Sequence, residues 1–140
     1  MENELEFTSK PATSREQSER LVALGLKKES ADMHWRMHRT FDGGEIWNCY
    51  AYKPVRWGVN NMLPAWSLYR LWEILPKVVF LRPALHLSMY GESVFYCTED
   101  YNEDFEKPFS GQLNLYDNII DCVEWLIQEG YFPKEYLEER

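Results

Sequence analysis

The sequence has few cysteines and no long apolar run. Its three cysteines, Cys49, Cys97 and Cys122, are odd in number and far apart, so we expect three buried thiols instead of a disulfide framework. No stretch of about 18 consecutive apolar residues is present. The acidic residues 1–6 also lack the basic and apolar parts of a signal peptide. These absences predict a cytoplasmic protein without a membrane segment.

The chain also lacks the common signatures of catalytic sites. It holds no glycine-rich phosphate loop, no nucleophile elbow and no CxxC pair. Its three histidines, His34, His38 and His86, do not lie in a recognisable catalytic or metal-binding pattern. The sequence therefore predicts no catalytic residue, no cofactor and no metal.

What the sequence does contain is typical of one ordered domain. Aromatic residues make up 16% and charged residues 27% of its 140 residues, a composition that can fold around its own core. We expect a mobile lead-in over residues 1–12, a single domain over residues 13–132 and a polar tail over residues 133–140.

Charge is unevenly distributed along the chain, whose net charge is −8. Residues 1–26 sum to −2, residues 27–90 to +4 and residues 91–140 to −10. A basic middle and an acidic end predict either two faces that meet inside the fold or a charged surface that meets a partner.

Two segments carry the start and stop signals of amphipathic helices. Residues 13–17 hold two overlapping capping-box patterns, so a helix is expected over residues 14–24, and Gly25 is placed to end it in the left-handed conformation. The clearest amphipathic pattern begins at residue 115 and runs to residue 127, just before Gly130.

A third helix is expected between two prolines, within residues 61–76. Pro64 suits the first turn of a helix, and Pro76 cannot continue one. Apolar side chains would cover nearly the whole circumference of this helix, so we predict that it is buried at the centre of the fold.

Alternation with a period of two marks two hairpins. The first joins residues 33–38 to residues 45–53 through the turn Asp42-Gly43-Gly44, and the second joins residues 85–90 to residues 93–98. The order of elements predicts an α+β fold, in which a small, mainly antiparallel sheet of two hairpins packs on a single layer of three helices.

Four sequence blocks in the chain resemble those of a known group of proteins. They are Thr13-Ser14-x-Glu16-Gln17-Ser18-x-x-Leu21-x-x-Leu24-Gly25-Leu26, Ala31-Asp32-Met33, Pro64-Ala65-Trp66-Ser67-Leu68 and Cys122-Val123-x-Trp125-Leu126-Ile127-x-x-Gly130-Tyr131. The group consists of small uncharacterised proteins carried by prophages and integrative elements of gut anaerobic bacteria. The resemblance implies a bacterial cytoplasmic accessory protein of a mobile element. It assigns no binding or catalytic residue, because the group has no known activity.

A small metal-dependent hydrolase that uses His34, His38 or His86 with carboxylates is one alternative function. On a helix, His34 and His38 would share one side, with Asp32 nearby as a third ligand. The alternating apolar residues predict a strand instead, on which positions i and i+4 lie about 13 Å apart, too far for one metal. We therefore expect solvent-facing strand histidines here.

The acidic segment 100–106 has the alternating oxygens of the first half of a calcium loop. Such a loop needs glycine where Phe105 stands and a bidentate glutamate where Gly111 stands. The pattern favours a solvated acidic loop, and weak binding of a divalent cation is the alternative.

Basic and aromatic residues are interleaved through residues 27–57 and form the one candidate nucleic-acid surface. They are Lys27, Lys28, Arg36, Arg39, Lys53 and Arg56, with Trp35, Trp47, Tyr50, Tyr52 and Trp57. Such residues can hold phosphates and stack bases. The sequence pI near 4.9 and the expectation that most of these rings are core make nucleic-acid binding the less favoured alternative.

The interpretation that we favour is a non-enzymatic interaction protein, whose partner is another protein or a second copy of itself. Exposed aromatic residues beside a loop or in a polar tail are typical of docking surfaces, and acidic residues can cover a basic partner. The candidate contact residues are Tyr52, Arg56, Trp57, Asp100, Asp104, Tyr131, Phe132 and Tyr136.

Overall fold

Three α-helices form the middle of the molecule in the computed structural model, which describes residues 10–58, 60–79 and 83–139. They are α1 (Arg15–Leu24), α2 (Leu68–Ile74) and α3 (Leu115–Glu129). Short 3-10 turns cover Lys28–Ser30, Glu103–Phe105 and Lys134–Tyr136. None of the helices in these ranges has the length and apolar character that crossing a membrane requires.

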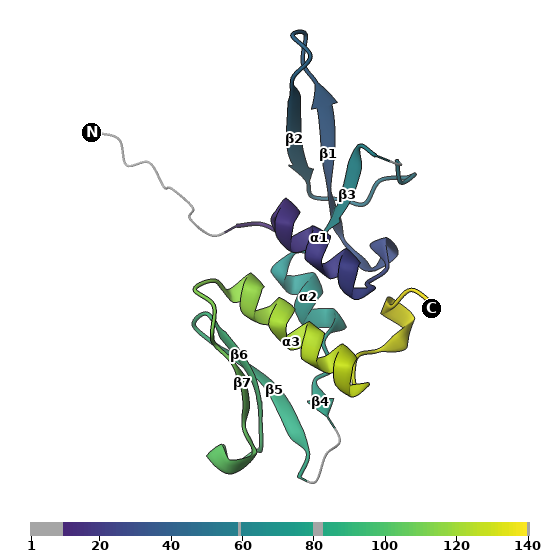
Figure 1. Ribbon diagram of the computed structural model, residues 1–140. Coiled ribbons are helices and arrows are strands. Elements are labelled where there is room, and N and C mark those ends of the chain that lie inside the picture. Colours follow the sequence, from purple (N-terminus) through teal and green to yellow (C-terminus); the bar gives the residue numbers. More distant parts are fainter. Residues whose placement is uncertain (1–9, 59, 80–82, 140) are drawn as a thin grey trace, which may run out of the picture.

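Two antiparallel sheets lie on opposite sides of the helices (Figure 1). The first is built from β1 (Met33–Arg39), β2 (Glu45–Tyr50) and β3 (Met62–Ala65), in the order β2-β1-β3. The second is built from β4 (Val78–Val79), β5 (Leu85–Tyr90), β6 (Ser93–Cys97) and β7 (Lys107–Phe109), in that order. We call the first the projecting sheet, because its β1–β2 hairpin extends away from the helices, and the second the distal sheet.

The prediction of an α+β fold is confirmed, whereas the prediction of one sheet is wrong. The two hairpins do form over the expected residues, but they belong to different sheets. Each hairpin is extended by short strands outside the expected ones: β3 pairs with β1, and β4 and β7 pair with β5 and β6. These strands contain two to four residues, too few for a period of two to be recognised.

Helix α1 begins and ends where its capping residues predict. The Ser14 hydroxyl accepts from the backbone N–H of Gln17, and the Gln17 side chain accepts from the Ser14 N–H, which completes the second of the two overlapping boxes. Gly25 has a φ of 107°, and the N–H of Leu26 donates to the carbonyl of Leu21. The local sequence therefore predicts both ends of this helix.

The central helix differs from its prediction because Pro64 does not start it. Pro64 lies in β3 opposite His34, at the edge of the projecting sheet, where a residue without an N–H is tolerated. Helix α2 begins at Leu68, after Ser67 accepts from the N–H of Arg70. The helix is thus only seven residues long, and Trp66 is buried just before it.

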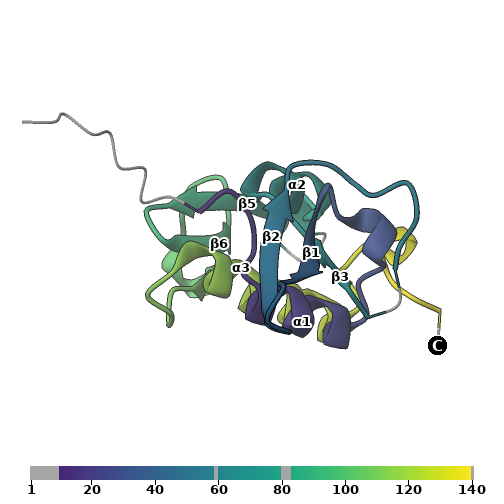
Figure 2. The ribbon, with the colours of Figure 1, turned by 90° about the horizontal axis from the view of Figure 1, so that it is seen from above.

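The main core gathers around α3. Ile119, Val123 and Leu126 are fully buried there, with Leu21 of α1 on one side and Tyr96 of the distal sheet on the other. Each such aliphatic side chain contributes about 1.5–3 kcal/mol by leaving water. Figure 2 shows α1 and α3 running beneath the projecting sheet, whose strands follow one another as β2, β1 and β3.

The two ends of the described chain are attached to this core. The Tyr116 hydroxyl donates to the carbonyl of Lys10, and Leu137 forms a β-bridge with Leu26. Residues 133–139, predicted as a polar tail, therefore lie against the turn after α1. Residues 1–9 of the predicted lead-in lie outside the described residues.

Candidate functional site

The projecting sheet has two chemically different faces. On one face, Met33 and Trp35 of β1 pack with Ala12, Ala65 and Cys49. The alternate residues of β1 and β2, together with the loop that follows β2, form the opposite surface, which we call the His34 face. Its members are His34, Arg36, His38, Ile46, Asn48, Tyr50, Tyr52 and Trp57.

His34 is the centre of this face and is completely buried. Its ring stacks on Tyr50, with centroids 5.2 Å apart and planes inclined by 19°. Tyr52 and Trp57 meet it edge-on, at 5.2 and 6.3 Å. The Nδ1 atom lies 2.6 Å from the carbonyl oxygen of Tyr52, which can only accept, so Nδ1 carries the proton.

The two strand histidines therefore have opposite environments. His38 is exposed, as predicted, and its Nε2 lies 2.8 Å from the Tyr50 hydroxyl. The prediction of a solvent-facing His34 is wrong, because Tyr52 and Trp57 of the following loop cover its ring. Burial by a loop cannot be read from the alternation of a strand.

Cationic side chains lie over the rings of the His34 face. The guanidinium carbon of Arg36 lies 5.5 Å from the Tyr50 ring centre, and Lys28 Nζ lies 5.9 Å from that of Trp57. The chain from residue 33 to residue 65 contains only two carboxylates, Asp42 and Glu45, both at the hairpin turn. The face is therefore positive and aromatic.

The same part of the fold carries the unpaired polar atoms of the interior. Among the buried side-chain nitrogens and oxygens of the described residues, only Nε2 of His34 and Nε of Arg36 have no hydrogen-bond partner. Such atoms cost free energy, and the other buried polar side chains of these residues are paired. The His34 face is thus less well optimised for stability than the rest of the core.

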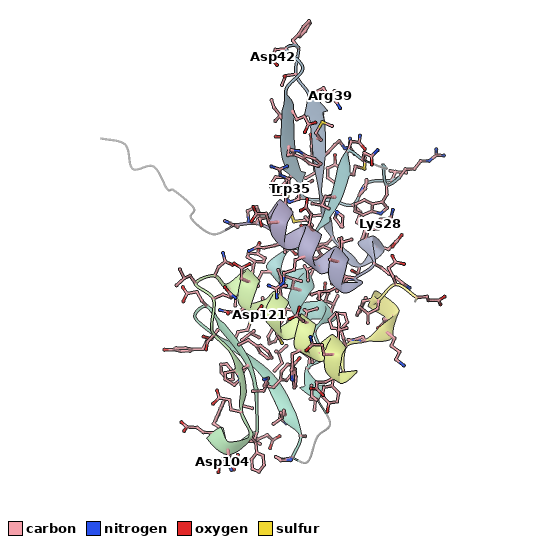
Figure 3. The ribbon with its side chains drawn as sticks, viewed as in Figure 1. Lys28, Trp35, Arg39, Asp42, Asp104 and Asp121 are labelled. Atoms are coloured by element: carbon pink, nitrogen blue, oxygen red, sulfur yellow. The ribbon has the colours of Figure 1, made fainter. Side chains whose placement is uncertain are left out.

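The β1–β2 hairpin and the loop after it also expose large apolar side chains to solvent. Phe41, in the turn between β1 and β2, and Val55, in the following loop, are fully exposed, and Ile46 and Tyr52 are about half exposed. Figure 3 shows Arg39 and Asp42 at the end of the hairpin that lies farthest from the helices. Phe41, Val55 and Ile46 are absent from the predicted contact residues. The turn signal after Phe41 could have identified it, since a ring within a tight turn is rarely buried.

The predicted contact residues fall into three separate places. Tyr52 and Trp57 belong to the His34 face, and the exposed Arg56 precedes Trp57 in the same loop. Asp104 is exposed on the opposite side of the molecule, at the end of the distal sheet (Figure 3), and Asp100 is exposed at the end of β6.

The C-terminal aromatic residues are packed against the core. Phe132 is buried, and Tyr136 meets it edge-on at 6.4 Å with the Arg70 guanidinium 5.5 Å away. Tyr131 packs on Trp125 at 5.7 Å. The eight predicted residues therefore do not form one surface.

The three histidines of the hydrolase alternative are not brought together. His86 lies in the distal sheet, where its Nε2 is 3.7 Å from a carboxylate oxygen of Glu99. No group of three or more His, Cys, Asp or Glu side chains within the described ranges could hold a metal ion.

The acidic segment has its own local hydrogen bonds. The Thr98 hydroxyl donates to Asp100 at 2.6 Å, which lowers the pKa of that carboxyl group. The Asn102 side chain accepts from the N–H of Asp104 and caps the turn Glu103–Phe105. The segment between β6 and β7 is thus held by hydrogen bonds among its own residues.

Comparisons of the chain with protein-family models, with curated proteins and with solved structures found no match.

Proposed function

We propose that this protein is a non-enzymatic binding protein and that the His34 face, with Phe41 and Val55 beside it, contacts a protein partner. The observation that carries the proposal is that the β1–β2 hairpin and the loop after it expose Phe41, Ile46, Tyr52 and Val55 and also carry the stacked aromatic and basic groups. Exposed apolar patches with aromatic and arginine residues are typical of protein interfaces.

The chemistry of this surface defines the partner that fits it. Burying a ring the size of Phe41 contributes about 1.5–3 kcal/mol, so the partner should offer an apolar pocket. Arg36, Lys28 and the exposed Arg56 would complement acidic residues around that pocket. On the resemblance to proteins of mobile elements, we propose that the partner is a bacterial cytoplasmic protein.

The experiment is capture of the partner from cells of the source organism, followed by calorimetry with the purified pair. Phe41→Ser combined with Arg56→Ser should weaken binding at least tenfold, because both side chains are exposed and needed for contact. Tyr90→Ser combined with Leu113→Ser is the control, since these residues are also exposed but lie in other parts of the chain. Equal affinity of both variants would contradict the proposal.

Single-stranded nucleic acid is the second candidate partner. The specific observation in its favour is that the His34 face contains no carboxylate, while Tyr50 lies beneath Arg36 and Trp57 beneath Lys28. Fluorescence anisotropy with a labelled single-stranded oligonucleotide tests it. Binding through phosphates would weaken steeply with salt, and Arg56→Ser would lower the salt slope by about 0.7 if it removes one contact.

A further inference from the structure

The four sheet edges of the described chain are not equally protected against pairing. β3 has four residues and contains Pro64, β7 has three and contains Pro108, and β4 has only two. Short edge strands and prolines prevent the addition of another strand. β2 has six residues, and it contains neither proline nor a basic residue.

The hydrogen-bond register identifies the backbone groups at the open edge of β2. The Thr40 N–H donates to the Gly44 carbonyl, so Thr40 and Gly44 form a hydrogen-bonded pair. In an antiparallel ladder every second pair is hydrogen-bonded, so the next such pairs are His38 with Ile46, Arg36 with Asn48 and His34 with Tyr50. Met37, by contrast, donates on the other side of β1, to the carbonyl of Asn61. Ile46, Asn48 and Tyr50 therefore bond to β1. The N–H and C=O groups of the three alternate residues, Glu45, Trp47 and Cys49, point outward, where no described strand lies.

We infer that β2 pairs with the β2 strand of a second copy of this chain, in antiparallel orientation and with Trp47 opposite Trp47 of the other copy. This register aligns three hydrogen-bonded pairs, Glu45 with Cys49, Trp47 with itself and Cys49 with Glu45, which form about six hydrogen bonds. A shift by two residues in either direction loses at least one of these pairs within β2. The result is one six-stranded sheet with a continuous His34 face.

The side chains of β2 favour a second copy of this chain as the partner that pairs with its open edge. Glu45 is the only charged residue of β2, and in this register it faces Cys49, so no like charges are opposed. The two Trp47 rings become a cross-strand aromatic pair, each with an Arg15 guanidinium 5.0 Å from its ring centre. The two Arg36 residues stay about three strand spacings apart, or about 14 Å, which exceeds the screening length of about 8 Å at physiological salt. A twofold axis makes this contact self-complementary and closed.

The inference goes beyond the proposed function, because it uses the edge of the sheet and not its face. Light scattering or sedimentation of the full-length protein should give twice the monomer mass of 16.8 kDa at high concentration, and less on dilution. Hydrogen exchange followed by NMR should show slow exchange at the amides of Glu45, Trp47 and Cys49. The amides of Ile46, Asn48 and Tyr50 should also exchange slowly, because they already bond to β1. Monomer mass at every concentration, or fast exchange at these three amides, would overturn the inference.

A cross-linking experiment tests the register itself. Glu45→Cys puts a thiol opposite the native Cys49 of the other copy, at a Cα separation of about 5.5 Å that a disulfide can span. Within one chain the two positions lie about 13 Å apart, so no internal disulfide can form. Cys97 and Cys122 are buried in the core, whereas Cys49 is only partly buried, so the two buried thiols should not compete. We expect a covalent dimer under mild oxidation.

Ile46→Cys is the matched control, since Asn48 and not a cysteine lies opposite it in this register. Both altered side chains are exposed, so both variants should fold, which circular dichroism can check. Equal cross-linking of the two variants, or none with Glu45→Cys, would overturn the pairing. Unchanged partner binding by the variant with Phe41→Ser and Arg56→Ser would contradict the proposed function but would leave the cross-linking result unchanged, so the two proposals can fail separately.

Discussion

The imidazole of His34 stacks on the Tyr50 ring at a centroid distance of 5.2 Å, and the same tyrosine holds His38 through its hydroxyl. One ring thus joins a fully buried histidine to an exposed one. Tyr50 thus contacts both the buried interior of the projecting sheet, through His34, and its exposed surface, through His38.

The two histidines should respond differently to truncation. His34→Ala leaves a cavity beneath Tyr52 and Trp57 and removes the bond to the Tyr52 carbonyl, so we expect a loss of about 3 kcal/mol of unfolding free energy. His38→Ala, at an exposed position, should change it by less than about 0.5 kcal/mol. Urea denaturation measures both values. Equal losses would mean that the loop after β2 does not cover His34.

Two glycines offer a test of backbone conformation without a steric effect. A Cβ added at Gly130 or at Gly111 would meet no heavy atom within 4 Å, but only Gly130 has a positive φ, of 79°. Gly130→Ala should therefore cost about 1–2 kcal/mol at the end of α3. Gly111→Ala should change stability by less than about 0.5 kcal/mol. Thermal unfolding of both variants gives the comparison, and an equal cost at both positions would contradict it.

Truncation of a buried side chain in α3 should strongly destabilise the fold. Leu126 is completely buried, and Leu126→Ala should lower the free energy of unfolding by about 2–5 kcal/mol through lost burial and the cavity that remains. Leu113→Ala removes the same atoms from an exposed position and should have little effect. Chemical denaturation measures the free energy of unfolding of both variants. Similar losses in the two variants would contradict the assignment of Leu126 to the core.

Stability should fall at alkaline pH. Burial raises the pKa of Tyr96 and of Cys122 well above their ordinary values. Above about pH 8.5 for the thiol and about pH 10 for the phenol, the unfolded chain loses these protons while the folded chain keeps them. The folded state then binds more protons, so unfolding becomes easier as the pH rises, by about 1.4 kcal/mol per pH unit for each group.

The variant Tyr96→Phe isolates the phenol. It should lose about 1 kcal/mol at neutral pH, because the hydroxyl donates to the Pro76 carbonyl at 2.8 Å, but its stability should decline less steeply above pH 10. Tyr90→Phe, on an exposed ring, is the matched control. Urea midpoints measured from pH 7 to about pH 11 give the pH dependence of stability. If stability above pH 10 declined as steeply in Tyr96→Phe as in the unaltered protein, the Tyr96 hydroxyl would not be the group that keeps its proton on folding.

Long-range hydrogen bonds show why part of the fold was not predictable. Asn118 of α3 is fully buried and donates to the Glu92 carbonyl at 2.6 Å, while its side-chain oxygen accepts from the N–H of Gln112. These bonds hold the turn between β5 and β6 against the start of α3. In the sequence Asn118 is one polar residue within an amphipathic pattern, and nothing local indicates its partners.

Local signals in the sequence were enough to predict the caps of α1 at Ser14 and Gly25, the end of α3 at Gly130, and the alternating strands of both hairpins. Three features became evident only in the folded chain: Pro64 joins an edge strand, the hairpins form two sheets, and the loop after β2 encloses His34. Capping and alternation depend on neighbours a few residues away. The pairing of strands and the covering of a side chain depend on segments that approach only when the whole chain has folded.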